Sequence, residues 1–451
     1  MAESSRRKVG RIEEDRISQL PLNVQETLLC SLPIRDAVRT SVLSKKWRHC
    51  WTMMPHLIFD NDFVHRVMDK LDQRGGDELM AYKFVSVINR TVLLHKGPII
   101  NFSLTIPQSQ CNAQIIHDFV DQWISLLSCK GIKQLTIKSS GLLEVKPHDF
   151  YSLDLTHLTL FKVRFPCTSA YGRFTSLTNL YLLKATSNLG QSILDCPVLE
   201  KLTLIICTGL FHTNFHAPNL KCLRQVYFGT DFEISCAGLE NLTEYSFTLL
   251  MLGTLMETKT SNMVKVLGSL HRIEKFSIAM KFMKYLAEGG CPNRLSKPLP
   301  YLKTLNISGI NFTHLSEVSC LLCMIWSAPN LCKLYISAEV RYEEKGLKNY
   351  RIEDSEDCTT INHLETVTFS YFKGLKAELE LVKFVLAHSP LLKTMFIHRD
   401  KRIKNDAALT MTEEILQYPR ASTIAQIRHL KCCVEIGDFD KELWVGYDIL
   451  S

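Results

Sequence analysis

An apolar template that recurs along most of this chain limits its fold more than any other feature. Positions 1, 4 and 6 of the template are apolar, as in "LTHLTL" (155–160), "LTNLYL" (177–182) and "LEKLTL" (199–204). Positions 4 and 6 lie two residues apart, so on a strand they share one face, which we expect to be buried. The other copies begin at Ile132, Leu242, Ile273, Leu302, Leu331, Leu364 and Leu392, and an imperfect copy with Gln225 at position 6 begins at Leu220.

The distance between successive first positions indicates the type of repeat. From Ile132 to Leu242 the steps are 23, 22, 22, 21 and 22 residues, and the later steps are 31, 29, 29, 33 and 28. These lengths match leucine-rich repeats, in which each unit buries its apolar face only against its neighbours. The predicted fold is therefore an α/β solenoid with a parallel sheet and helices on its convex side, irregular in its second half. "NFSLTI" (101–106) is predicted as the strand that starts the array, and "IIHDFVDQWISLLS" (115–128) as a helix.

The template also predicts the environment of individual side chains. Positions 3 and 5 point away from the face that carries positions 4 and 6, onto the opposite surface of the sheet. We expect the position 4 residues Leu202, Leu305 and Leu334 to be buried. Their position 3 neighbours should be exposed, and these are Lys201, Thr304 and Lys333.

The first sixty residues follow a helical pattern instead. Asn23, with Glu26 three residues later, can form a capping box at the start of a helix that ends before Pro33. Its apolar residues at helical spacing are Val24, Leu28 and Leu32.

Two more short helices are predicted after Pro33. Asp36 can cap the first, and Ser44 can cap the second, which carries Trp47 and Trp51 one turn apart. Three helices of this length cannot bury all their apolar side chains among themselves. Part of their surface should therefore stay exposed and serve as an interface.

These segments resemble an F-box, the motif through which receptor subunits of ubiquitin ligases bind a Skp-type adaptor. The pattern is met by Leu20-Pro21, Leu32-Pro33, "DAVRTSVLSKKW" (36–47) and Trp51, whereas Leu22 and Gln25 depart from the family's usual Asp and aliphatic residue. The resemblance implies a set of adaptor-binding residues. These are Leu20, Pro21, Leu32, Pro33, Val38, Val42, Leu43, Trp47 and Trp51.

The C-terminal part carries a second resemblance. "YFKGLKAELELVKFVLAHSPLLKTMFI" (371–397) and "EEILQYPRASTIAQI" (413–427) resemble the FBD motif that follows the repeats in plant F-box proteins. We expect a helix over 377–388, a strand over 392–397 and a helix over 413–417. With the F-box and the repeats, nearly the whole chain is similar to the plant F-box/FBD/LRR-repeat family.

The expected organisation has five parts in chain order. They are the F-box at 12–60, linking helices and a first repeat at 61–130, leucine-rich repeats at 131–357, the FBD motif that closes the solenoid at 358–430, and a C-terminal tail at 431–451.

Composition and charge limit the compartment and the partners. No apolar run reaches the length of a membrane span, and the charged N-terminus lacks the apolar segment of a signal peptide. We therefore expect a nuclear and/or cytoplasmic protein with 16 reduced cysteines and no membrane partner. The net charge is +7, but the sequence has no long basic run with interleaved aromatic residues. We therefore expect no nucleic-acid partner. "SSRRKVGR" (4–11) is either a nuclear import patch or, more simply, a solvated tail.

The sequence contains no recognisable set of catalytic residues. Cys320 and Cys323 have the spacing of half a zinc site, but no second pair follows at the required distance, so core packing is the simpler interpretation. No nucleophile elbow and no phosphate-binding glycine loop occurs. The chain is predicted not to be an enzyme and to need no cofactor or metal.

The resemblance implies the substrate-recognition subunit of a Skp–cullin–F-box ubiquitin ligase. The F-box would bind the adaptor and, through it, the cullin and a ubiquitin-conjugating enzyme, while the repeat surface holds an unknown target protein. Because aromatic and arginine side chains are the usual anchors of interfaces, we predict a target-binding set on the outward positions. It consists of Tyr181, Arg224, Tyr335 and Phe396.

Two other interpretations remain open. In one, the solenoid is a receptor that depends on a small molecule such as a hormone or an inositol phosphate, and its outward basic residues contact that ligand. Those residues are Lys201, Arg224, Lys275 and Lys333, for which the simpler interpretation is that they keep the solenoid soluble. In the other, the chain is an interaction scaffold without a role in a ligase.

Overall fold

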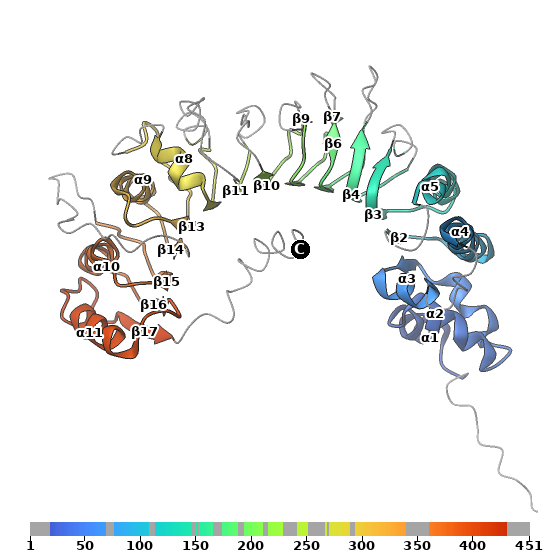
Figure 1. Ribbon diagram of the computed structural model, residues 1–451, viewed down its shortest axis with the longest axis horizontal. Coiled ribbons are helices and arrows are strands. Elements are labelled where there is room, and N and C mark those ends of the chain that lie inside the picture. The colour runs from blue at the N-terminus through green and yellow to red at the C-terminus, as the bar shows by residue number, and fades with distance from the viewer. Residues whose placement is uncertain are drawn as a thin grey trace, which may run out of the picture. The chain divides into compact units, whose positions relative to one another are not determined.

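The computed structural model describes residues 19–68, 76–107, 113–145, 150, 153–165, 174–187, 194–210, 215–228, 241–250, 267, 270–288, 294–339 and 360–430. The chain divides into two compact units, Met1–Lys162 and Val163–Ser451, each built of strands and helices (Figure 1). The predicted tail at 431–451, the basic segment at 4–11 and the predicted F-box residues 12–18 lie outside the described residues.

Short helices open the described part of the first unit, as the sequence predicts. They are α1 (Leu22–Cys30), α2 (Ile34–Arg39) and the 3₁₀ helices η1 (Thr40–Val42) and η2 (Trp47–Met53). The predicted caps Asn23 and Asp36 are wrong, because α1 and α2 begin directly after Pro21 and Pro33. The two proline carbonyls accept the first helical N–H bonds, so each Leu-Pro pair starts a helix. The third predicted cap, Ser44, is also not the residue that precedes its helix, because η2 begins directly after Lys46, although Ser44 Oγ accepts a hydrogen bond of 3.4 Å from the Trp47 backbone N–H.

A parallel sheet with helices forms the remainder of the first unit. Its strands are β1 (His56–Phe59), β2 (Asn101–Ile106), β3 (Gln134–Glu144) and the first part of β4 (His157–Phe165), which continues past Lys162, in this order. Its helices are α3 (Asn61–Met68), α4 (Gly76–Leu94) and α5 (Ala113–Ser128). The prediction that the strand at 101–106 starts the array is wrong by one strand, because β1 pairs with it in register, with Leu57 opposite Phe102. The predicted helix at 115–128 is confirmed, and its Ile116, Val120 and Trp123 are buried.

The second unit is a row of parallel strands. Its main strands are β5 (Asn179–Leu183), β8 (Lys201–Ile205), β10 (Cys222–Phe228), β11 (Glu244–Leu250), β12 (Lys275–Met280), β13 (Thr304–Ile310), β14 (Lys333–Ala338), β15 (Thr366–Phe372), β16 (Thr394–Arg399) and β17 (Gln426–Leu430), paired in this order. The shorter strands are β6 (Thr186–Ser187), β7 (Leu194–Asp195) and β9 (Phe215–His216), of which β7 and β9 pair with each other.

Helices cover one face of this row. They are α8 (Phe282–Glu288), α9 (Leu315–Trp326), α10 (Lys376–His388) and α11 (Asn405–Leu416), and they lie on the outer side of the strands (Figure 1). The repeat steps that begin at Ile273, Leu302 and Leu364 therefore hold a helix between strands, namely α8, α9 and α10. The predicted helix at 377–388 is confirmed as α10, but the one predicted at 413–417 is too short, because α11 begins at Asn405. None of the described helices is long and apolar enough to cross a membrane.

The buried face carries the template positions. Leu202, Leu305 and Leu334 are buried as predicted. Positions 1, 4 and 6 are buried in all the copies whose three positions are apolar. In the imperfect copy the polar Gln225 is only half-buried; its Oε1 accepts a hydrogen bond of 3.0 Å from Tyr245 Oη, and the next residue, Val226, is buried instead.

One of the three residues predicted to be exposed is buried instead. Lys201 and Lys333 are exposed, but Thr304 is only 9% exposed. Thr304 lies in register between Lys275 on β12 and Lys333 on β14. We attribute its burial to the two longer side chains that flank its short one.

The turns before β10, β11 and β14 are hydrogen-bonded to the previous repeat. Asn219 Nδ2 donates to Pro197 O over 2.8 Å, Asn241 Nδ2 to Pro218 O over 2.9 Å, and Asn330 Nδ2 to Pro300 O over 2.7 Å. The residue at position 2 adds exposed ion pairs between neighbouring repeats, such as Lys221–Glu200 at 2.7 Å. The asparagine bonds fix the turn geometry, whereas exposed ion pairs of this kind contribute about 0–1 kcal/mol each.

A buried glutamate holds the start of α10. Glu378 is fully buried, and its Oε2 accepts hydrogen bonds from the backbone N–H groups of Lys373 (3.0 Å) and Leu375 (2.9 Å). Burial raises the pKa of Glu378 to about 7. Glu317 has the same place in α9: it accepts a bond of 2.9 Å from Asn311 N–H, and burial raises its pKa.

Replacing Glu378 by glutamine is expected to flatten the fall in thermal stability toward alkaline pH. The folded chain holds this proton up to about pH 7, whereas an ordinary carboxyl titrates near 4.5. This difference in pKa contributes to the free energy of unfolding. The contribution is complete below pH 4.5 and is lost as the pH rises through about 7. Thermal midpoints of Glu378→Gln should therefore drop less than those of the wild type between about pH 5 and about pH 8. Glu380→Gln, on the same helix, is the control, and its thermal midpoints should change with pH as those of the wild type do. If the midpoints of Glu378→Gln also ran parallel to those of the wild type, the prediction would be wrong.

Candidate interaction surfaces

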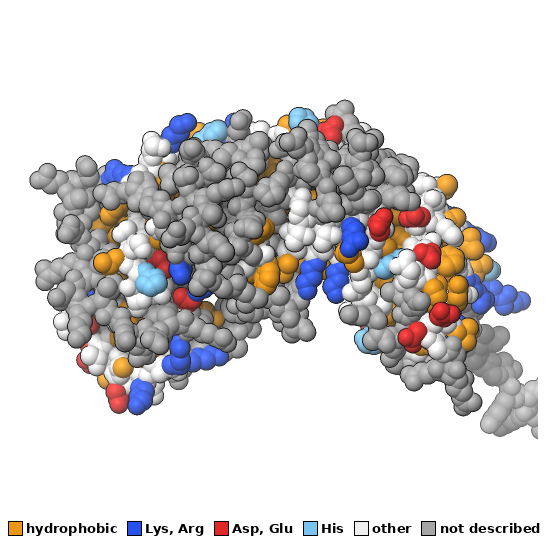
Figure 2. All heavy atoms as spheres, turned by 45° about the horizontal axis from the view of Figure 1, so that its top comes forward, with side chains coloured by type: hydrophobic (Ala, Val, Ile, Leu, Met, Phe, Trp, Pro, Cys, Tyr) orange, Lys and Arg blue, Asp and Glu red, His pale blue; other side chains and the backbone are white. Residues whose placement is uncertain are grey.

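An exposed apolar surface lies on α1, η1 and the residue after η1. Val42 is 86% exposed and Leu43 65%, and Leu28 on α1 and Leu32 just after it are also exposed. Exposed hydrophobic side chains are visible over the first unit, on the right of Figure 2. Large apolar side chains that stay in water at this density are typical of a protein interface.

The predicted adaptor-binding residues separate into a surface set and a core set. Pro21, Leu32, Pro33, Val42 and Leu43 are exposed, and Leu20 and Val38 are half-buried. The core set consists of Trp47 and Trp51, which are only 4% and 7% exposed.

The two tryptophans are therefore placed to support the surface from inside the module. They share the core with Leu29, Ile34 and Ala37, which belong to α1 and α2. Gln25, the departure from the family pattern, is also buried, and its Nε2 donates to Leu20 O over 2.8 Å. Gln25 thus ties α1 to the chain before it.

Basic residues flank Val42 and Leu43 in the sequence. They are Arg39, Lys45, Lys46 and Arg48, and all four are exposed. Positive charge of this kind favours a partner with an acidic surface, because complementary charge steers the encounter of two proteins.

In the second unit, the four predicted target-binding residues fall in one row of the sheet. Strand pairing places position 5 of each repeat opposite position 5 of the next. The row is Tyr181, Thr203, Arg224, Ser246, Ser277, Asn306, Tyr335, Thr368, Phe396 and Arg428. We call it the outward row, because it points away from the helix-covered face that positions 4 and 6 occupy. Neighbouring strands are about 4.8 Å apart, so the row extends on the order of 40 Å.

The large side chains of the outward row gather at its two ends. Tyr181 and Arg224 form one end; burial raises the pKa of Tyr181, while the charge of Arg224 acts in the opposite direction. Tyr335 and Phe396 form the other end, where the Arg428 guanidinium lies 6.0 Å from the centre of the Phe396 ring. Small or polar residues of β11, β12 and β13 separate the ends.

Two members of these surfaces, Arg428 and Leu28, were not predicted from the sequence. Arg428 lies on β17, a strand that the template did not include because the polar His429 stands at position 6. Leu28 was treated only as part of a helical pattern, although its spacing from Val24 and Leu32 already placed all three on one face of the helix.

The outward basic residues do not form one cluster. Lys201, Arg224, Lys275 and Lys333 lie on β8, β10, β12 and β14, with β11 and β13 between the later ones. Lys275 is already engaged, because its Nζ lies 2.5 Å from Glu244 Oε1, and this hydrogen bond raises the pKa of Lys275.

The described residues contain no group of three or more His, Cys, Asp or Glu side chains that could hold a metal ion. Cys320 and Cys323 are both buried in α9, where they pack as core residues.

Comparison with known proteins gives matches along most of the chain. Residues 17–59 match the F-box domain family, residues 120–336 match the family described as FBD-associated F-box protein At5g56370, LRR repeats, and residues 360–397 match the FBD family. The F-box/FBD/LRR-repeat protein At1g13570 of Arabidopsis thaliana is 34% identical over 431 residues, which cover 92% of this chain and 99% of that protein. The F-box/FBD/LRR-repeat protein At5g56420 of the same plant is 24% identical, over 92% of this chain and 98% of that protein.

Proposed function

Because the chain belongs to the F-box/FBD/LRR-repeat family, we propose that it is the substrate-recognition subunit of a Skp–cullin–F-box ubiquitin ligase. Its F-box binds a Skp-type adaptor and, through it, the cullin and a ubiquitin-conjugating enzyme. Its repeats hold the target protein. The observation that carries the proposal is the exposed Val42–Leu43 surface on a module whose tryptophans are buried, because such a surface needs a partner.

Adaptor binding draws on two physical terms. Burial of Val42, Leu43 and Leu28 removes apolar area from water, which is favourable by roughly 25 cal/mol per Å². The basic residues that flank Val42 and Leu43 in the sequence supply the second term, by steering an acidic partner into place. Trp47 and Trp51 act through the fold, because they keep α1, α2 and η1 in the arrangement that exposes these side chains.

The ligase chemistry belongs to the partners in this proposal. The chain binds the target near the conjugating enzyme, so that ubiquitin transfer proceeds at the high effective concentration of a tethered reaction. The outward row suits this task, since its strands fix the spacing of Tyr181, Arg224, Tyr335 and Phe396. Two groups of anchors at its ends favour an elongated target segment over a compact one.

A quadruple substitution tests the target-binding part. Tyr181→Ala, Arg224→Glu, Tyr335→Ala and Phe396→Ser should together remove captured targets while adaptor binding and the thermal midpoint stay near their wild-type values. The four side chains are half-buried on the outward row and outside the main core, so we expect a modest effect on folding. The measurement is quantitative mass spectrometry of proteins captured with the full-length chain while degradation is blocked.

A second variant serves as the control for this test. Leu409, Glu413, Leu416 and Gln417 are exposed on or next to α11, on the helix side of the second unit. Their replacement by alanine should leave capture unchanged. Capture that survives the row substitutions but is lost in the helix variant would place target binding on the helices instead.

A further inference from the structure

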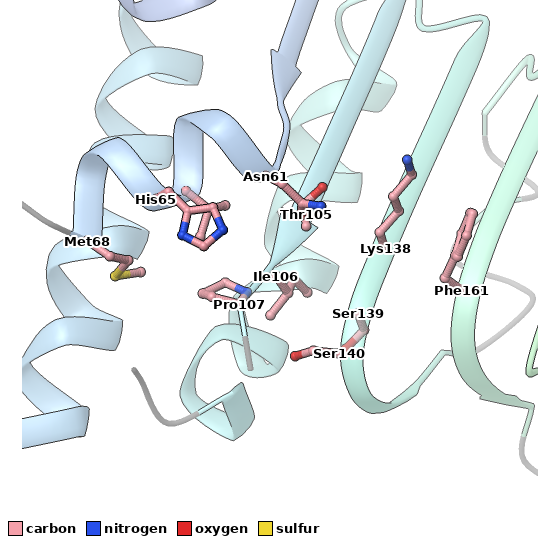
Figure 3. A pocket seen from close by; sticks show the side chains of 11 residues that line it. Asn61, His65, Met68, Thr105, Ile106, Pro107, Lys138, Ser139, Ser140 and Phe161 are labelled. Atoms are coloured by element: carbon pink, nitrogen blue, oxygen red, sulfur yellow. The ribbon is translucent and has the colours of Figure 1, made fainter. Parts of the chain in front are cut away.

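A cavity of about 330 Å³ in the first unit has no role in the proposed function. Figure 3 shows α3 on one side of it, carrying Asn61 and His65, and Lys138 of β3 with Phe161 of β4 on the other side, with the end of β2 between them. Its size is at the lower end of the range of small-molecule sites. It lies at the carboxyl end of β2 and beside the middle of β3 and β4.

Each described polar side chain that lines the cavity can donate a hydrogen bond, and Lys138 can only donate. The ammonium group of Lys138 lies 5.3 Å from the centre of the Phe161 ring, and none of the described carboxylates pairs with it. Ser140 Oγ is buried and has no hydrogen-bond partner among the described residues. A second ammonium group is held beside this wall, because Lys162 Nζ donates to Ser140 O over 2.8 Å. The described residues that line the cavity include no Asp and no Glu.

The other part of the lining is apolar. Val64 and Met68 of α3 face it, with Ile106 and Pro107 at the end of β2 and the ring of Phe161. An unpaired buried hydroxyl costs roughly 1–3 kcal/mol, and a ligand oxygen that accepts its hydrogen bond would remove that cost. A ligand matched to the site therefore needs an acceptor-rich anion at one end and an apolar body at the other.

We propose that this cavity binds a small molecule with an oxyanion, such as a phosphate, on an aromatic or aliphatic body. Lys138 pairs with the oxyanion and Ser140 Oγ donates a hydrogen bond to it. The apolar body packs against Met68, Ile106 and Phe161. The site uses none of the outward-row residues, and its occupancy is independent of the ligase role.

Calorimetric titration of the full-length chain with 1-naphthyl phosphate tests this inference. Saturable one-to-one binding is expected, about tenfold or more tighter than that of 1-naphthol or of inorganic phosphate, because only the joined probe satisfies both halves of the site. Absence of saturable binding overturns the proposal. Equal affinity for 1-naphthol also overturns it, because the cavity would then be an apolar void.

Three variants locate the binding. Lys138→Gln should lower the affinity for 1-naphthyl phosphate by about tenfold or more, because hydrogen bonds to charged groups are stronger than those between neutral groups. Ser140→Ala should weaken it by a smaller factor and leave the thermal midpoint unchanged or higher, since the substitution removes an unpaired buried hydroxyl. Lys96→Gln makes the same charge change at an exposed lysine outside the cavity and should match the wild type. If Lys138→Gln and Lys96→Gln bind the probe equally well, the ligand is elsewhere.

Discussion

Replacing Val42 and Leu43 by glutamate is expected to weaken binding of the Skp-type adaptor by at least about a hundredfold, or roughly 3 kcal/mol. In the free chain both side chains are mostly in water, so the change should leave the thermal midpoint of the module intact. In the complex the two carboxylates would be buried against an apolar partner without a counter-charge. The affinity of the purified full-length chain for the adaptor, measured by surface plasmon resonance, checks the prediction.

The first unit offers a matched control for this double variant. Leu93 and Leu94 on α4 are also adjacent, apolar and exposed, so glutamate at both positions makes the same chemical change away from the F-box. This control should bind the adaptor like the wild type. Wild-type affinity in the Val42/Leu43 variant, or loss of affinity in the control, would mean that the adaptor-binding surface is assigned to the wrong side chains.

Leu334→Ala is expected to lower the free energy of unfolding of the second unit by about 2–5 kcal/mol. Leu334 is fully buried and stands in register between Leu305 on β13 and Val367 on β15, so its removal leaves a cavity in the middle of the stack. Lys333→Ala, one residue away and on the exposed face, should change that free energy by less than about 0.5 kcal/mol. Urea denaturation followed by circular dichroism measures both, and equal effects of the two substitutions would contradict the repeat register.

The repeat could be predicted because its signal is redundant. Each copy places three apolar residues on a face that only neighbouring copies can cover, so one poor copy, such as that with Gln225, does not hide the pattern. Thr304 was predicted wrongly because the template describes only the residue's own strand. The exposure of a short side chain also depends on the lengths of its neighbours across the sheet, here Lys275 and Lys333.

Backbone conformation at position 8 had no sequence signal. Lys184, Ile206, Met280 and Tyr371 all have positive φ, between 51° and 64°, although none is a residue that favours it. Only one copy uses glycine there: Gly309 has φ 82°, and a Cβ on it would lie 3.0 Å from the Cα of Met280. The stacked strands impose this turn on the repeats that have it, at a cost of roughly 1 kcal/mol or more for a residue with a side chain.

The candidate surfaces were predicted to different extents. The outward row followed from strand periodicity, because position 5 keeps its face in every copy. In the F-box, the sequence pattern grouped nine residues without separating the buried Trp47 and Trp51 from the exposed Val42 and Leu43. Apolar type alone does not distinguish a core residue from an interface residue. That distinction required the packing of α1, α2 and the two 3₁₀ helices.

Ubiquitin transfer in a reconstituted assembly tests the central claim most directly. The assembly combines the full-length chain with the adaptor, the cullin, a conjugating enzyme and a target captured as described above. The wild-type chain should support transfer to the target, and both the Val42/Leu43 double variant and the outward-row quadruple variant should lose it, each through a different partner. Transfer that continues at the wild-type rate with both variants, or that is the same without the chain, would contradict the proposal that this protein joins a target to the ligase.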